Sequence, residues 1–196
     1  KLNKYNTKKI KNIVILIINF FDYFYKKKII NFLKEKKINI EYFVDVGAHH
    51  GETIELFSRN FKIKKIYAFE PSPVNFKNLK KKYQNKKISF DLKIENFALG
   101  NSNKNIEFYQ LNESSSSTAK KLNFESKYLI RKLKFLNINQ KNYFQSFTVK
   151  QVKLANYYTD KNITKVDFLK IDTEGSEFEI LRGLDEKIRG VNYIFF

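Results

Sequence analysis

The sequence predicts an α/β protein with a mainly parallel sheet, and three observations favour this fold class. Short apolar runs rich in β-branched residues alternate along the chain with stretches of helical periodicity. Two of these runs end on an acid, Asp45 and Glu70, and each acid is followed by turn and helix-start residues. Right-handed crossovers bring the carboxyl ends of parallel strands to one edge of the sheet. We therefore expect a ligand to bind at that edge.

Composition limits the classes of function. The 196 residues suit one domain with a short extension, and the absence of cysteine excludes disulfides and cysteine-based zinc sites. A chain without cysteine suits a reducing compartment, so we expect a cytoplasmic protein. The only two histidines are adjacent, and no metal-ligand spacing is present, which favours a metal-independent protein.

The net charge of +18 would suit a nucleic-acid partner, but its distribution argues against one. Lysines occur in small groups along the whole chain, and they rise together with Asn, Ile, Phe and Tyr, the residues of AT-rich codons. The charge alone is therefore weak support for a nucleic-acid partner.

Residues 1–40 are predicted to form a helical extension, with a helix over about residues 10–36. Its apolar run at 13–21 falls well short of the ~20 residues that span a bilayer, so no transmembrane span is expected. Packing on a domain or on a second copy is the favoured role. The alternative is an interfacial anchor at the inner membrane face, because basic residues flank the apolar part on both sides.

Residues 41–196 are predicted to form the main domain. We expect a strand at 42–46, a helix at 52–60 and a strand at 63–69. The next helix begins with Ser72 as N-cap and Pro73 at its first position, and it buries Phe76, Leu79 and Tyr83. A third strand is expected at 88–97.

The alternation of strands and helices changes after residue 101. An extra strand is predicted at 105–111 and a serine-rich loop at 112–118. Residues 119–146 show no dominant periodicity, so they could be either a substrate-selecting insertion or a plain surface insertion. A short helix at 152–158 and a strand at 166–172 follow. A capping box at 176–179 then starts a helix with Phe178, Leu181 and Leu184 facing inward, before a last strand at 191–196.

The turn after the first strand carries a nucleotide-binding pattern. Gly47, His49 and Gly51 follow Asp45 at positions two, four and six, where this pattern places glycines so that backbone can approach a ligand. His49 replaces the middle glycine, and histidine is among the residues enriched at positive φ. Ala48 lies within the same turn. His50 is either a helix cap or a base.

Glu70 lies 25 residues after Asp45, where a carboxylate can accept both hydroxyls of an adenosine ribose. Pro71 and Ser72 complete its turn. The alternative is a surface acid beside a proline turn. We expect Asp45 and Glu70 to lie side by side and to bind the sugar jointly.

A third cluster, Asp167–Gly175, surrounds the end of the later strand. Alternation places Lys170 and Asp172 on one side of it, with Glu174 just beyond. Buried ionisable groups are costly unless they are paired or used in catalysis. Either an ion pair of Lys170 with Asp172 or Glu174, or a functional role, would explain the cluster.

Residues 43–52, 68–73, 96–100 and 166–183 together resemble the FkbM family of S-adenosylmethionine-dependent methyltransferases. The most specific block is residues 168–183, and the resemblance spans roughly 42–196. It implies a class I methyltransferase fold, a Rossmann-like three-layer sandwich with a mainly parallel seven-stranded sheet. It also implies S-adenosylmethionine as methyl donor and a hydroxyl oxygen as acceptor, on a sugar, a glycan or another small molecule.

The resemblance also assigns site residues. Asp45, Gly47, Ala48 and Gly51 match the methionine- and ribose-side loop, and Glu70 matches the ribose-binding acid. Adenine-side residues are matched by Asn96, Ala98 and Leu99, and the block near the methyl and acceptor by Lys170, Asp172, Glu174 and Glu177. His49 departs from the family, which commonly has Asn there. The family's last two strands are missing, and both ends of the chain resemble those of a fragment.

In-line methyl transfer would place an acceptor oxygen against the sulfonium methyl, with a base to take the hydroxyl proton. Asp172 or Glu174 is the favoured base and His50 the alternative. Two other classes of function stay open. An RNA methyltransferase would show strongly salt-dependent acceptor transfer, and a non-catalytic cofactor-fold module would transfer nothing.

Overall fold

A computed structural model describes residues 26–111, 117–119, 126–127, 130–131 and 144–196. The chain divides between Asn39 and Ile40 into two compact units, which are described separately. In the first unit, residues 26–35 form a helix in which Ile30 and Leu33 are buried. The rest of the expected 10–36 helix lies outside the described residues. Over the described part of the chain, every helix is too short or too polar to cross a bilayer.

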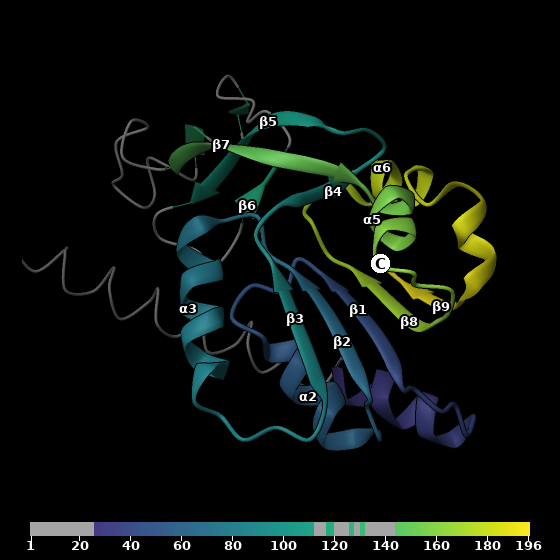
Figure 1. Cartoon of the computed structure of the whole chain (residues 1–196). Coiled ribbons are helices and arrows are strands. Elements are labelled where there is room, and N and C mark those ends of the chain that lie inside the picture. Colours follow the sequence, from purple (N-terminus) through teal and green to yellow (C-terminus); the bar gives the residue numbers. More distant parts are fainter. Residues whose placement is uncertain (1–25, 112–116, 120–125, 128–129, 132–143) are drawn as a thin grey trace, which may run out of the picture. The chain divides into compact units, whose positions relative to one another are not determined.

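The second unit is organised around a five-stranded sheet in the order β3-β2-β1-β8-β9 (Figure 1). Every neighbouring pair is parallel, which confirms the predicted mainly parallel sheet. The strands are β1 (Tyr42–Val46), β2 (Lys65–Phe69), β3 (Asp91–Glu95), β8 (Val166–Ile171) and β9 (Val191–Phe195). The order reverses between β1 and β8, so the topological switch point lies between these two strands.

Helices follow the strands much as the periodicity predicted. They are α2 (Glu52–Asn60), α3 (Pro73–Gln84), α5 (Leu154–Asp160) and α6 (Glu177–Arg182), with a 3₁₀ helix η2 (Asp185–Gly190). The α2 bounds agree with the prediction. At the start of α3, the Ser72 hydroxyl accepts the Asn75 N–H at 3.2 Å and Pro73 occupies the first position, which confirms the predicted cap. Leu79 and Tyr83 are buried as expected, whereas Phe76 is partly exposed.

Apolar contacts on both faces of the sheet account for three layers. On one face, the Phe57 ring of α2 stacks on Phe43 with ring centroids 4.5 Å apart and packs against Phe168 at 5.1 Å. On the other face, the Tyr157 ring of α5 meets Phe69 edge-on at 4.9 Å. Valines 44 and 46, Leu169, Ile171 and residues of α5 and α6 share that second core cluster. The three central strands, β1, β2 and β8, are therefore buried on both sides, whereas the edge strands β3 and β9 are partly exposed.

A second sheet has the order β4-β7-β5-β6, with β4 (Ala98–Gly100), β5 (Lys104–Leu111), β6 (Ser117–Thr118) and β7 (Phe144–Lys153). Strand β5 confirms the extra strand predicted there. Several boundaries were wrong because long-range pairing, rather than local pattern, decides them. The strand predicted at 63–69 begins at Lys65, and the one predicted at 88–97 spans Asp91–Glu95. Residues 117–118 pair as a strand instead of continuing the loop, and residues 152–153 belong to β7, so the helix predicted at 152–158 is Leu154–Asp160.

The predicted capping box before α6 is also wrong. Ser176 is the N-cap residue but makes no side-chain cap hydrogen bond. Phe178 is 68% exposed, whereas Ile180 and Leu184 are buried. The prediction was therefore wrong for Phe178, whose place Ile180 takes, but right for Leu184 and, in part, for Leu181, which packs partly buried against the core.

The two sheets meet where Gly183 follows α6. Its carbonyl accepts the Ala155 N–H of α5 at 2.8 Å. A Cβ built on Gly183 would overlap the carbonyl of Gly100 in β4. Backbone therefore packs directly on backbone at this junction, with no side chain between.

Candidate functional site

The loop after β1 adopts left-handed backbone at three positions. Gly47, His49 and Gly51 have φ values of 78°, 48° and 80°. The N–H groups of Gly47 and Ala48 both donate to the Phe69 carbonyl at 3.0 Å, which ties the loop to the end of β2. On the β8 side, a Cβ built on Gly47 would overlap a backbone carbonyl oxygen. Glycine is required here by both conformation and space.

Glu70, directly after β2, is buried and held by two backbone donors. Its Oε2 accepts the His49 N–H at 2.8 Å, and its Oε1 accepts the Ser72 N–H at 2.9 Å. Burial raises the pKa of this carboxyl, and the two N–H groups oppose the rise. The Asn96 amide donates to the carbonyls of Glu70 and Pro71 at 2.9 and 3.2 Å. The carboxylate is therefore fixed in position before any ligand arrives.

Lys170 of β8 is buried among three oxygen acceptors. Its Nζ lies 3.1 Å from Oδ1 of Asp45, 3.0 Å from the Gly47 carbonyl and 3.5 Å from Oδ2 of Asp172. Burial disfavours the ammonium, but the two carboxylates outweigh it and raise the pKa of Lys170. For Asp45, which is fully buried, burial raises the pKa against the opposing pull of Lys170. An ion pair with Asp172 was one of the two explanations considered for this cluster, and the structure adds Asp45 to it.

The two strand-end acids therefore have different partners. In the β1–β2 register, Asp45 pairs with Ala68, two residues before Glu70. The Asp45 carboxylate contacts Lys170 on the neighbouring β8, whereas the Glu70 carboxylate contacts the loop after β1 and the start of α3. The two carboxylates share no partner in these contacts, and joint binding of one sugar by both acids stays a prediction.

The loop after β8 is closed by a carboxylate. Glu177 accepts the backbone N–H groups of Thr173 and Gly175 at 3.0 Å and the Thr173 hydroxyl at 3.1 Å. Burial alone would raise its pKa, but these donors lower it. This hydrogen-bonding role of Glu177 was not among the predictions from sequence. An acid two residues after a glycine, in the first turn of a helix, was the available signal.

Three candidate bases lie on the exposed side of these loops. The Asp172 side chain is 70% exposed, and Glu174, with φ of 56°, is exposed as well. The His50 ring is exposed and lies 3.8 Å, centroid to centroid, from the His49 ring. Partial burial and the charge of His49 lower the pKa of His50, which favours its neutral form.

Three residues near the predicted site lie away from the acids described above. Ala98 and Leu99 are both buried in β4, Leu99 in the main core and Ala98 in a cluster with Phe108 and Val149. Asp167 lies at the amino end of β8, where it accepts the N–H groups of residues 41 and 42, each at 2.9 Å. It is therefore separate from the Lys170 cluster.

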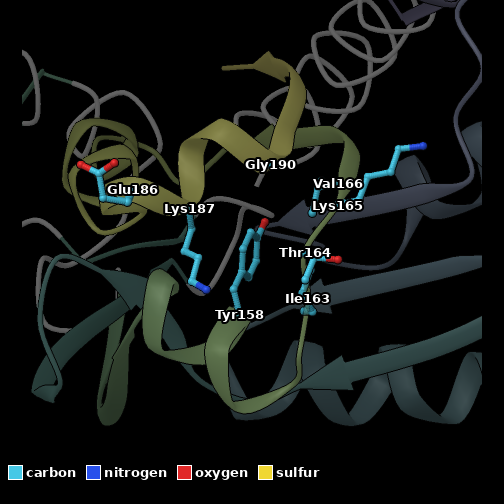
Figure 2. A pocket seen from close by; sticks show the side chains of 8 residues that line it. All are labelled: Tyr158, Ile163, Thr164, Lys165, Val166, Glu186, Lys187 and Gly190. Atoms are coloured by element: carbon cyan, nitrogen blue, oxygen red, sulfur yellow. The ribbon is translucent and has the colours of Figure 1, made fainter.

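A hollow of about 220 Å³ lies at the amino end of β8, and Figure 2 shows the residues around it. Because the acids described above lie at the carboxyl ends, this hollow is not part of the candidate site. Its lining comes from the end of α5, the start of β8 and η2: Tyr158, Ile163, Thr164, Lys165, Val166, Glu186, Lys187 and Gly190. Across the described ranges, no three His, Asp or Glu side chains gather as metal ligands, and metal independence stays a prediction.

The parallel sheet, covered by helices and with its switch point between β1 and β8, defines an α/β domain with a Rossmann-like fold. Residues 45–196 match the methyltransferase FkbM domain, and the chain belongs to this family. Methyltransferase 1 of Beauveria bassiana (strain ARSEF 2860) is 25% identical over 150 residues, which are 74% of this chain and 59% of that protein. The crystal structure of methyltransferase FkbM from Methylobacillus flagellatus KT matches 76% of this chain and 30% of its own, with a TM-score of 0.46 and 17% identity. The chain thus spans under two thirds of each relative.

Proposed function

We propose that this chain is an S-adenosylmethionine-dependent O-methyltransferase domain that methylates a hydroxyl of a sugar, a glycan or another small molecule. The observation that carries the proposal is the arrangement at the switch point. A buried ammonium joins the ends of β1 and β8, and a fixed carboxylate follows β2. Family membership supports methyl transfer, and the donor and acceptor are our proposal.

The residues present fit an adenosine-type donor. Glu70 is buried and uses one lone pair of each carboxylate oxygen on a backbone N–H, and the Asn75 side chain also bonds to it. The lone pairs that remain would accept the ribose hydroxyls. The left-handed turn at 47–51 lets backbone approach the ligand closely. The Asn96 side chain donates to the backbone carbonyls of Glu70 and Pro71. The family resemblance assigns Asn96 to the adenine side of the donor site. Asp45 would act through Lys170, because its fully buried carboxylate is already paired with that ammonium.

When bound, S-adenosylmethionine supplies a methyl group on a positively charged sulfur. The protein's part is to align the acceptor hydroxyl and to take its proton. Asp172 is the favoured base, because its exposed carboxylate lies at the switch point and Lys170 holds it only at 3.5 Å. Glu174 and His50 are the alternatives. Lys170 would fix the position of Asp172 without contacting the acceptor.

Isothermal titration with S-adenosylmethionine tests donor binding. We expect Glu70→Gln to weaken binding at least tenfold, because hydrogen bonds to a charged group are worth about 1.5–3 kcal/mol. Glu186→Gln is the matched control, since Glu186 is exposed on η2 and pairs with Arg189 at 3.1 Å. Urea unfolding of both variants separates a lost contact from a lost fold. Absence of heat for the wild-type chain at millimolar donor would refute the proposal.

Transfer of labelled methyl to a panel of sugars and glycans identifies the acceptor class. Asp172→Asn, Glu174→Gln and His50→Asn then distinguish the bases, because removal of the true base abolishes the pH dependence of transfer on that group. An RNA acceptor, which the charge of +18 would suit, would instead show transfer that falls steeply with salt. The absence of cysteine supports the cytoplasm as the proposed location.

A further inference from the structure

The β5–β6 hairpin is attached to the loop after β2. The Ser72 hydroxyl donates to Oε1 of Gln110, and Nε2 of Gln110 donates to Oδ1 of Asn75 at 3.3 Å. Ser72 is also the N-cap of α3, and its own N–H donates to Glu70. Gln110 in β5 is therefore connected, through one residue, to the carboxylate proposed to bind the ribose.

The same hairpin is attached to the loop after β8. The Thr118 hydroxyl of β6 donates to the Glu174 carbonyl at 2.9 Å. In the antiparallel register, Tyr109 pairs with Thr118 and Gln110 pairs with Ser117. The two attachments thus lie on neighbouring rungs of one hairpin, although they reach loops on different strands of the main sheet.

Strand order determines what lies between the two attachments. Strand β1 lies between β2 and β8, so the loop after β1 is flanked by the two loops to which the hairpin is bound. Figure 1 shows the second sheet beyond the carboxyl ends of β1, β2 and β3. The hairpin therefore reaches from the loop after β2 to the loop after β8, the two loops that flank the loop after β1.

We propose that Gln110 and Thr118 are positioning residues that make this hairpin a brace. The brace fixes the spacing between the loop that binds the donor ribose and the loop that carries the acceptor-side acids. The expected effect on donor binding rests on the proposed function, whereas the coupling of the two loops by the hairpin does not. Since a brace acts only when both ends are fixed, loss of either attachment should have the same effect as loss of both.

Titration of S-adenosylhomocysteine into the whole chain tests this non-additivity. Gln110→Leu and Thr118→Val remove the polar groups with little change in size. We expect each to weaken binding about two- to tenfold, the range that one neutral hydrogen bond supplies. The double variant should bind S-adenosylhomocysteine no more weakly than the single variant with the lower affinity. Multiplied fold-changes, or wild-type affinity in either single variant, would overturn the proposal.

Matched controls make the same chemical changes away from the attachments. Thr148→Val alters an exposed threonine of β7, and Gln84→Leu alters an exposed glutamine at the end of α3. Both controls should bind like the wild-type chain. Thermal unfolding of all variants shows whether each chain is folded at the titration temperature, and affinities are compared only below the transition.

Hydrogen exchange without any ligand tests the brace independently of the proposed function. Thr118→Val should speed exchange of the Gly175 amide and also of the Ser72 amide, which lies at the other end of the brace. A merely local role would change Gly175 alone and would overturn the inference. If the wild-type chain binds no donor but the two amides respond together, the proposed function fails and the brace stands.

Discussion

Replacement of Lys170 by methionine tests the most heavily buried charge cluster of the candidate site. The ammonium is 7% exposed and Asp45 is fully buried, so the variant leaves a carboxylate without its cation. Breaking a buried pair by removing one partner costs about 3–5 kcal/mol. Asp172, 70% exposed, adds little, because exposed pairs contribute about 0–1 kcal/mol. We therefore expect Lys170→Met to lower the free energy of unfolding by about 3–5 kcal/mol at pH 7.

The loss should depend on pH in a defined direction. Without Lys170, the folded-state pKa of Asp45 lies still further above its unfolded value of 3.8. A carboxyl with a raised folded pKa binds its proton more tightly in the folded state, so the variant becomes more stable relative to wild type as pH falls. The difference in unfolding free energy should thus shrink from pH 8 to pH 5.

Urea unfolding followed by far-UV circular dichroism measures these free energies, and the chain has no tryptophan to serve as a fluorescent probe. The double variant Asp45→Asn/Lys170→Met removes both charges and should recover much of the loss. Asp172→Asn serves as the control and should cost less than about 1 kcal/mol. The reasoning is refuted if Lys170→Met lies within about 1 kcal/mol of wild type, or if its loss is independent of pH.

Three further predictions concern single side chains. Tyr157→Phe should cost about 1 kcal/mol in urea unfolding, because its hydroxyl donates to Glu95 at 2.9 Å. Tyr158→Phe should be neutral or stabilising, since its buried hydroxyl has no hydrogen-bond partner among the described residues. Equal costs would contradict this difference. Gly47→Ala should cost about 2 kcal/mol or more, because φ is 78° and the added Cβ would overlap a carbonyl oxygen; a neutral result by thermal unfolding would contradict the strain argument. For Asp167, burial raises the pKa, but backbone N–H groups outweigh it and hold the pKa below 3.8. Its stabilisation is present above that pH and lost as pH falls, so Asp167→Asn should flatten the acid side of the stability profile, and an unchanged profile would refute its role.

Local rules predicted the elements whose cause is local. The α2 bounds follow from apolar spacing after a glycine turn, and the start of α3 follows from Ser72 and Pro73. Phe178 shows where such rules fail. Periodicity over a six-residue helix has too few repeats to set its phase, and packing against the core places Ile180 inward instead.

Long-range partners were beyond local rules. Alternation placed Lys170 and Asp172 on one side of a strand, but it carries no information on the neighbouring strand that brings Asp45 to 3.1 Å. The attachments of Gln110 and Thr118 likewise depend on how the second sheet lies against the first. Sequence reasoning could therefore propose which residues belong to the site, while the pairings among them required the fold.

The bare backbone contact at Gly183 ties the place of the second sheet to that of α6. Any side chain there would push β4 away from α6, and the second sheet would move with it. The placement of β5, β6 and β7, and with it of both hairpin attachments, therefore depends on a position that has room for a hydrogen atom alone.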